Sequence, residues 1–513
     1  MEELLQLVSI VKHKGQRSLQ LVNQNFRKKE KSKDNILYNG LINNDFNDEV
    51  EAAQVLFNTD PGNRNFRNTK AKLKQKLLNN LFFLDYHKSE YTAYQKTFYS
   101  CLNQIHQMKI LILEGANCIA IKKIPAIVKS ALDFELFEIG LDALLINRSE
   151  YSKLGQCTPV NNAANKIKKI KSILKVVNEC EDIYYDTIVI MNKSLSSCEK
   201  IIEDIPKRIK RIEYLAKKHK LARLDILANK LRIACNTANQ NHIENLNVCN
   251  YLESKYLNLD STKITVDLQY KELIFLKLYS LYVMNRNEEG IKYAYKTSSI
   301  FKSGDFDWFK FNEYHFLLLM KAEKFHQATK VFRSIRINKN FHKLSTIDQE
   351  RWKIYRVYLL FVNDSKLIKW GFDIDNFKKI VPDFGKDYQG YSVAILIIQF
   401  LLYFREADIK NLKIKLNRLS QLSSVHLDKR HNYRNSIFIR MLEIISEKEF
   451  NYELIYEKGA TYLRKLINYQ IPPDWLQELE VIPYEKLWEY VLNILKTNKY
   501  YRHYRFYNLH EVE

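Results

Sequence analysis

The sequence predicts an all-α protein. Apolar residues recur at helical spacing through most of the 513 residues, and no run alternates apolar and polar residues as a half-buried strand does. No Asn-Gly or Asp-Gly turn joins two such runs. The chain has only 12 Gly and 8 Pro, about a third of the usual share. We therefore expect few loops with special backbone geometry.

Residues 1–85 are predicted to form a basic helical module. Its expected helices cover residues 2–11, 36–42, 49–57 and 65–84. The last of them follows a loop at Asp60-Pro61-Gly62, and residues 64–76 carry six cations and no acid. The helix then becomes apolar toward Leu84. One end should therefore be solvated and basic while the other is buried.

Helical hairpins with short connections are expected in residues 86–160, and longer helices in residues 161–260. From Ile167 to Ile212, 13 of 14 positions at heptad spacing are apolar, with Glu181 the exception. Pro206 should interrupt a helix, and Ser196 with Glu199 forms a capping box. We therefore expect two or three helices to share this seam, which pairs either within the chain or between two chains of an oligomer.

Residues 261–370 are predicted to return to helical hairpins, and an irregular break between Gly371 and Gly390 is the best internal boundary. Residues 391–513 form the last predicted region. Its expected helices cover residues 391–404, 409–420, 433–446, a segment ending near 466, and 484–495. A tail at residues 499–507 alternates cations with aromatic rings.

Three segments share a small residue flanked by larger apolar residues on one helix face. They are Phe325-x-x-Ala328-x-x-x-Phe332, Phe137-x-x-Gly140-x-x-x-Leu144 and Tyr456-x-x-Gly459-x-x-x-Leu463. A small residue lets two helices approach closely, and its neighbours fill the space beside it. The pattern resembles the second half of a tetratricopeptide repeat (TPR), although no period of 34 connects the three. The resemblance implies antiparallel helix pairs stacked into a curved solenoid with a concave binding surface. A non-repeating helical bundle is the alternative.

Cysteine usage and the lack of export or membrane signals suggest a cytosolic protein. Seven cysteines, an odd number and at least 14 residues apart, are typical of small buried residues in a reducing compartment. The first residues lack the order of a secretory signal. The longest apolar stretch, residues 393–404, is too short to cross a bilayer. We expect a cytoplasmic protein that does not insert into membranes.

Enzyme chemistry finds little support in the sequence. No two Gly lie close enough for a dinucleotide fingerprint or a nucleophile elbow, and no His-Cys cluster supplies zinc ligands. The spacings of Arg336 to His342 and Arg505 to His510 resemble those of helical ribonucleases of the HEPN type. Pro382-Asp383 with Lys386 is similar to part of a restriction-type nuclease, but no predicted strand flanks it. We expect no catalytic residues, no metal and no cofactor, and keep a helical nuclease as the weakest alternative.

Binding is therefore the predicted function. The main prediction is a non-catalytic scaffold or adaptor that holds another protein or a peptide through aromatic and Arg anchors. The alternative is a nucleic-acid-binding regulator, since the net charge is +22 and basic segments recur. The candidate polyanion contacts are Arg64, Arg67, Lys70, Lys74, Lys207, Arg208, Lys210 and Arg211. Solvated faces of amphipathic helices would carry the same cations.

Overall fold

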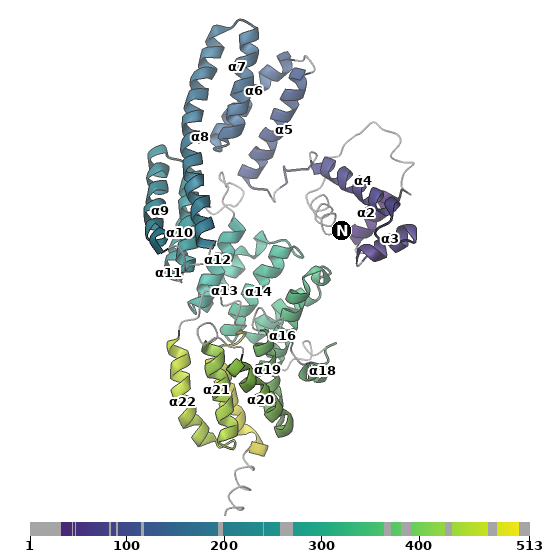
Figure 1. Ribbon diagram of the computed structural model, residues 1–513, viewed down its shortest axis with the longest axis vertical. Coiled ribbons are helices and arrows are strands. Elements are labelled where there is room, and N and C mark those ends of the chain that lie inside the picture. The colour runs from purple at the N-terminus through teal and green to yellow at the C-terminus, as the bar shows by residue number, and fades with distance from the viewer. Residues whose placement is uncertain are drawn as a thin grey trace, which may run out of the picture. The chain divides into compact units, whose positions relative to one another are not determined.

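A computed structural model describes most of the chain. It covers residues 32–43, 45–46, 48–81, 84–88, 91–113, 117–192, 199–239, 241–256, 270–363, 371–380, 391–425, 433–469 and 480–501. These residues are all-α, with no β-strand among them (Figure 1). The chain divides into two compact units, the first comprising residues 1–229 and 252–268 and the second residues 230–251 and 269–513.

Three helices near the start of the first unit enclose a small core of their own. They are α2 (Lys33–Asn43), α3 (Glu49–Phe57) and α4 (Arg64–Asn80). Leu37 on α2, Ala53 on α3 and Leu73 on α4 are among the residues buried between them. We call α2, α3 and α4 the N-terminal module. The expected helix at residues 2–11 lies outside the described residues, and α4 ends four residues earlier than predicted.

The rest of the first unit consists of further helices, of which the first five each pack on a neighbour in sequence. They are α5 (Ala93–Leu113), α6 (Asn117–Asp133), α7 (Phe137–Lys153), α8 (Cys157–Asn192) and α9 (Glu199–His219), followed by α10 (Ala222–Ala238) and α11 (His242–Tyr256), which contribute residues to both units. Two helices, α8 and α9, share the heptad seam, and they pack on each other within the chain. Its residues Ile167, Val177, Ile205 and Ile212 are buried.

Pro206 differs from the sequence-based expectation because it lies inside α9. A proline removes one backbone N–H and so one helical hydrogen bond. The helix nevertheless continues through the proline, and the burial of Ile205 and Ile209, on either side of it, offsets the lost hydrogen bond. Pro125 lies inside α6 in the same way.

The second unit is built of helical hairpins. Its helices are α12 (Tyr270–Val283), α13 (Asn287–Thr297), α14 (Phe306–Lys321), α15 (Phe325–Arg336), α16 (Thr346–Val362), α18 (Ile374–Lys379), α19 (Tyr391–Glu406), α20 (Ile409–Val425), α21 (Tyr433–Glu447), α22 (Tyr452–Asn468) and α23 (Tyr484–Thr497). Neighbours in sequence pack against each other, and α12 also packs on α14 (Figure 1). The predicted break between Gly371 and Gly390 contains the short helix α18, so this part of it is regular.

One turn geometry recurs at the helix ends, contrary to the expectation of few special loops. Seven of the described turns have a residue with positive φ, followed by a residue whose N–H donates to the carbonyl five positions earlier. The positive-φ residues of these turns are Glu135, Gly155, Lys220, Asn285, Glu323, Ala407 and Glu449. This is the Schellman motif, which closes a helix by satisfying its last carbonyls. Six of these seven residues are not glycine, so the low glycine content of the chain does not predict the number of such turns.

Lys220 offers a test of this turn, because its side chain is exposed and its φ is 55°. A non-glycine residue in this conformation costs about 1 kcal/mol, so we expect Lys220→Gly to stabilise the protein by about that amount. The matched change Lys210→Gly, at an exposed site inside α9, should destabilise it by about 1 kcal/mol. Urea denaturation of the two variants beside the wild type measures both. If both variants change the free energy of unfolding in the same direction, the assigned turn at Lys220 is contradicted.

The C-terminal segment, residues 480–501, runs along the hairpins of the second unit. The Tyr282 hydroxyl, at the end of α12, donates to the backbone carbonyl of Glu480, and Glu323, in the turn after α14, pairs with Lys486 at 3.1 Å. Farther along the segment, Tyr490 contacts the ring of Phe361 of α16, Asn498 donates to the backbone carbonyl of Arg405, and Tyr501 donates to the backbone carbonyl of Phe404 of α19. The segment therefore ties together the C-terminal ends of α12, α14, α16 and α19.

The described part of the basic aromatic tail includes a residue of the core. Tyr501 is buried, and its ring stacks between Phe404, at 4.8 Å, and Phe450, at 5.1 Å, so it belongs to the core. The rest of the predicted tail, residues 502–507, lies outside the described residues. Cys157 also differs from expectation because it is exposed, whereas Cys101, Cys180 and Cys249 are buried.

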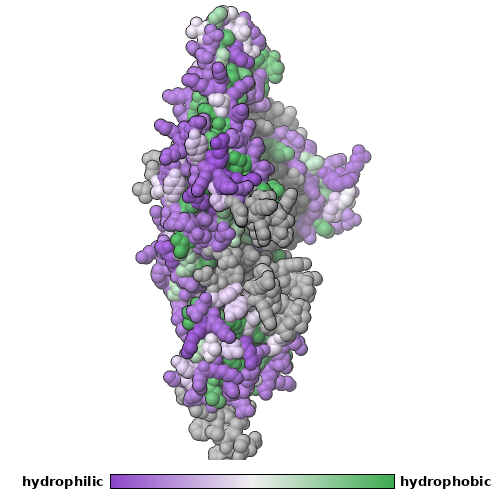
Figure 2. Space-filling view, turned by 60° about the vertical axis from the view of Figure 1, so that its left-hand side comes forward, coloured by the Kyte–Doolittle hydropathy of each residue, from purple (hydrophilic) through white to green (hydrophobic). Residues whose placement is uncertain are grey.

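The surface carries hydrophobic side chains only in small groups on the face shown in Figure 2, where they are scattered among hydrophilic ones. Scattered exposure of this kind is normal and marks no interface by itself. Among the described helices, none is both long and apolar enough to cross a bilayer.

Candidate functional site

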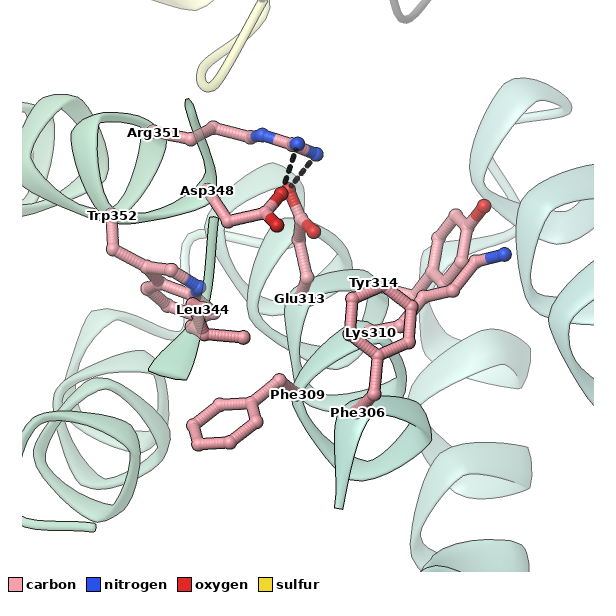
Figure 3. Close-up of a pocket in the computed structure, with 9 residues that line it drawn as sticks. All are labelled: Phe306, Phe309, Lys310, Glu313, Tyr314, Leu344, Asp348, Arg351 and Trp352. Carbon is pink, nitrogen blue, oxygen red and sulfur yellow. Dashed lines mark hydrogen bonds and ion pairs between the residues drawn. The ribbon is translucent and has the colours of Figure 1, made fainter. Parts of the chain in front are cut away.

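A pocket of about 220 Å³ opens in the second unit between α14 and α16. Its lining residues are Phe306, Phe309, Lys310, Glu313 and Tyr314 from α14, Leu344 from the loop before α16, and Asp348, Arg351 and Trp352 from α16 (Figure 3). The α14 residues follow the spacing of one helix face, and so do the α16 residues. The pocket therefore lies between facing stripes of two helices.

Aromatic packing fixes the floor of the pocket. Trp352 is buried and contacts the rings of Phe316 and Tyr355, at 5.5 and 5.3 Å between centroids. Phe309 is also buried. In contrast, the ring of Phe306 is 67% exposed at the rim. A rigid apolar floor with an exposed aromatic rim is suited to holding an apolar side chain from another molecule.

Two carboxylates share one arginine at the polar end of the pocket. Arg351 donates to Oε1 of Glu313 at 2.8 Å and to Oδ1 of Asp348 at 2.6 Å (Figure 3). The Tyr355 hydroxyl donates to the same oxygen of Glu313 at 2.6 Å. Burial raises the pKa of Glu313 above its usual value, although Arg351 and Tyr355 favour the charged form. Within the described part of the chain, Oε2 of Glu313 accepts no hydrogen bond.

Capping of α16 positions Asp348. The Ser345 hydroxyl accepts from the backbone N–H of Asp348 at 3.1 Å and donates to Oδ2 of Asp348 at 2.7 Å. This leaves Oδ1 for Arg351. The carboxylate is therefore held between the cap of its own helix and the guanidinium of Arg351.

The lining of the pocket carries two carboxylates and two cations, and its negative charge is local to the polar end. The amino group of Lys310 lies over the ring of Phe275 at 4.7 Å and points away from Glu313 (Figure 3). Two carboxylates then face one guanidinium, which leaves a surplus of one negative charge beside aromatic rings. Such a site favours a cationic group on an apolar stem.

The predicted packing residues lie at helix contacts, with one exception. Phe137, Gly140 and Leu144 are buried in α7, and a Cβ at Gly140 would lie in ordinary contact with Ala131 and Leu132 near the end of α6. On α15, Ala328 and Phe332 are buried, while Phe325 is half-buried against the core.

The exception occurs in the α22 segment. Gly459 is buried, but the ring beside it is Trp488 of α23, not Tyr456. Tyr456 is 57% exposed and stacks on Tyr452, so its predicted packing role is wrong. The reason is that α23 follows α22 as a further packing layer and fills the space above the glycine. Leu463 is half-buried against the core.

The predicted polyanion contacts fall on two separate helices of the first unit. On α4, Arg64 and Arg67 are exposed, Lys74 is half-buried, and Lys70 pairs with Glu49 at 2.7 Å. On α9, two of the four cations are paired, Lys207 with Asp204 at 2.8 Å and Arg211 with Glu179 at 2.9 Å. Arg208 donates to the hydroxyl of Thr187, and Lys210 is exposed.

The residues considered for nuclease chemistry are not assembled into a site where the structure describes them. Arg336, in the last turn of α15, lies over the ring of Phe341, and the backbone carbonyl of His342 accepts from Gln349. Arg505, His510, Pro382 and Asp383 lie outside the described residues, as does Lys386. Across the described ranges, no group of three or more His, Cys, Asp or Glu residues is placed to hold a metal ion.

Comparison with known proteins finds no matching family model, and neither a curated protein nor a solved structure matches the chain. The architecture and the pocket are therefore the basis for any functional proposal.

The pocket was not predicted from the sequence, although the sequence contains two signals for it. Phe306, Phe309, Glu313 and Tyr314 follow helical spacing that mixes aromatic residues with one acid. Ser345-x-x-Asp348 is a capping signal at the start of the next helix. What no pattern showed is that Arg351 bridges the two carboxylates across the helices.

Proposed function

We propose that this protein is a non-catalytic adaptor of the cytosol that binds a segment of another protein, and that its hairpins are degenerate TPR-like repeats. The recurring turn supports the repeat assignment. In the turns at Glu135, Asn285 and Glu323, the fifth residue after the positive-φ position is small: Gly140, Gly290 and Ala328, respectively. In each hairpin the small residue thus occupies the same place on the second helix.

The pocket between α14 and α16 is the observation that carries the binding proposal. α14 is the first helix of the α14–α15 hairpin, and α16 is the helix that follows this hairpin. In a TPR-like stack, α16 would then be the first helix of the next repeat. In a TPR-like stack, the first helices form the face that receives a partner. The pocket is therefore placed where an extended segment lying across the stack would insert a side chain.

The chemistry of the pocket defines the anchor of the partner. The buried rings of Phe309 and Trp352 receive an apolar stem, and Oε2 of Glu313 accepts from a cationic end. A Lys or Arg side chain has both parts, because its methylene groups are apolar and its head is charged. We therefore propose a basic residue within a peptide segment as the anchor.

Selection from a library of random peptides with the full-length protein tests the proposal. We expect the bound peptides to be enriched in Lys or Arg next to an apolar residue. Phe306→Ala should weaken a selected peptide at least about tenfold, because it removes an anchor ring at the rim. Glu313→Gln should reduce the preference for the basic residue over its uncharged replacement.

Tyr456→Ala is the matched control, since Tyr456 is a similarly exposed ring on α22 of the same unit. It should leave peptide affinity unchanged. Peptides without a basic residue, or equal losses in Phe306→Ala and Tyr456→Ala, would reject the pocket as the binding site. Thermal unfolding of each variant checks that the hairpins are intact.

A further inference from the structure

The second candidate surface is the exposed face of α4 in the N-terminal module. We infer that this face binds the major groove of double-stranded DNA. The inference is independent of the pocket, because it rests on a different helix and on a different distribution of charge.

Charges in the module are segregated by helix. Residues 32–81 contain seven Lys and Arg and six Asp and Glu, so the module is close to neutral as a whole. Six of the seven cations lie on α4, which has no acidic residue among its 17. The acids lie on α2, on α3 and in the connections. A single helix therefore presents the positive charge.

Different kinds of side chain occupy the centre and the edges of the exposed face of α4. Arg64, Asn68, Ala71 and Gln75, spaced by four, three and four residues, form one stripe, and all four are exposed. At 100° per residue, Arg67 and Lys74 lie on one side of this stripe and Lys72 lies on the other, with Lys76 farther round the helix, where it pairs with Asp34. Cations thus flank both edges of a stripe of amide, guanidinium and methyl groups.

Ion pairs with α2 and α3 keep the exposed stripe of α4 turned away from the rest of the module. Lys70 bonds Glu49 of α3, and Lys76 bonds Asp34 of α2. Burial is the largest single influence and would raise the pKa of Asp34, but the hydrogen bond and the charge of Lys76, together with further hydrogen bonds to the carboxylate, lower this pKa to about 2. Lys70 likewise lowers the pKa of Glu49 through its hydrogen bond. Together with the buried Phe66, Leu73 and Leu77, these two ion pairs fix the rotation of α4 about its own axis.

This arrangement matches a DNA major groove in size and chemistry. The groove is about 12 Å wide and admits one α-helix, whose flanking cations then meet the phosphates on both sides. Asn and Gln pair with adenine, Arg pairs with guanine, and an alanine methyl contacts thymine. The major groove of an RNA duplex is too narrow for a helix. A membrane surface is disfavoured because the central stripe offers only Ala71 as an apolar residue.

Titration of the full-length protein with a DNA duplex and an RNA duplex of the same sequence tests the inference. We expect the DNA duplex to bind more tightly, with a steep loss of affinity between about 50 and 200 mM salt. The variant with Arg64, Arg67, Lys72 and Lys74 all changed to Gln should bind DNA at least about tenfold more weakly at low salt. Its salt slope should fall by about 0.9 for each phosphate that the variant no longer neutralises.

A control on α9 removes the same formal charge. Changing Lys207, Lys210, Arg211 and Lys217 to Gln should leave DNA affinity within about twofold of wild type. Asn68→Ala with Gln75→Ala should keep the salt dependence and lose the sequence preference found by selection from random duplexes. Equal weakening by the α4 and α9 variants, or equal binding of RNA and DNA duplexes, would overturn the assignment. Peptide binding by the α4 variant shows that the rest of the protein is folded.

Discussion

Arg434→Met is expected to destabilise the second unit by about 3–5 kcal/mol, because it leaves a buried carboxylate without its partner. The Arg434 side chain is 4% exposed. Its guanidinium donates to both oxygens of Glu480, at 2.9 and 2.7 Å, to Glu485 on α23, and to the backbone carbonyl of Leu466 at the end of α22. Loss of this one side chain removes the anchor at the start of the C-terminal segment.

Urea denaturation together with limited proteolysis measures the effect. We expect a lower unfolding midpoint and new cleavage near the start of residues 480–501, because Arg434 holds that end of the segment through Glu480 and Glu485. Arg434→Met combined with Glu480→Leu should recover part of the stability, since no buried charge is then left unpaired. The control Arg211→Met breaks an exposed pair with Glu179 and should cost less than about 1 kcal/mol. A similar loss of stability in Arg434→Met and Arg211→Met would contradict the expected contribution of the buried ion pair between Arg434 and Glu480.

Gly459→Ala is expected to destabilise the same unit by about 2–3 kcal/mol. A Cβ at this position would lie 2.5 Å from Cζ2 and 3.1 Å from Cε2 of Trp488. Trp488 is fully buried, so its rigid ring has no free space in which to move. The added methyl group therefore has to displace α23 from α22.

Gly62→Ala serves as the control, because no atom lies within 4 Å of a Cβ built there. It should change stability by less than about 0.5 kcal/mol. Trp488→Phe removes the part of the ring that clashes, so the double variant with Gly459→Ala should lose less than the sum of the single losses. If the stability losses of Gly459→Ala and Trp488→Phe simply add, the clash with the Trp488 ring is not the reason why residue 459 must be glycine.

The helical elements themselves were largely predictable from local pattern. Residues 49–57 were expected as a helix and form α3, and the expected helices at 391–404 and 484–495 correspond to α19 and α23. Helical periodicity predicts these elements because each helix buries one face, and its apolar residues are spaced so that they lie on that face. The assignment to five regions with boundaries at 85, 160, 260, 370 and 391 stays a prediction.

Turn geometry was not predictable from composition. The left-handed residue in six of the seven recurring turns is Glu, Lys, Asn or Ala instead of Gly. A Schellman turn can hold such residues because its two hydrogen bonds and the packing of the flanking helices outweigh a cost of about 1 kcal/mol. Counting glycines therefore underestimates the number of closed hairpins.

The candidate sites also differ in how much of each can be predicted from the sequence. The sequence alone determined that α4 is basic and free of acids, since charge is a property of the residues themselves. Only the tertiary structure showed that Arg351 bridges Glu313 and Asp348, that Trp488 covers Gly459, and that residues 480–501 run along the ends of four helices. These contacts join residues far apart in the chain, and local spacing carries no information about which distant helix face will meet another.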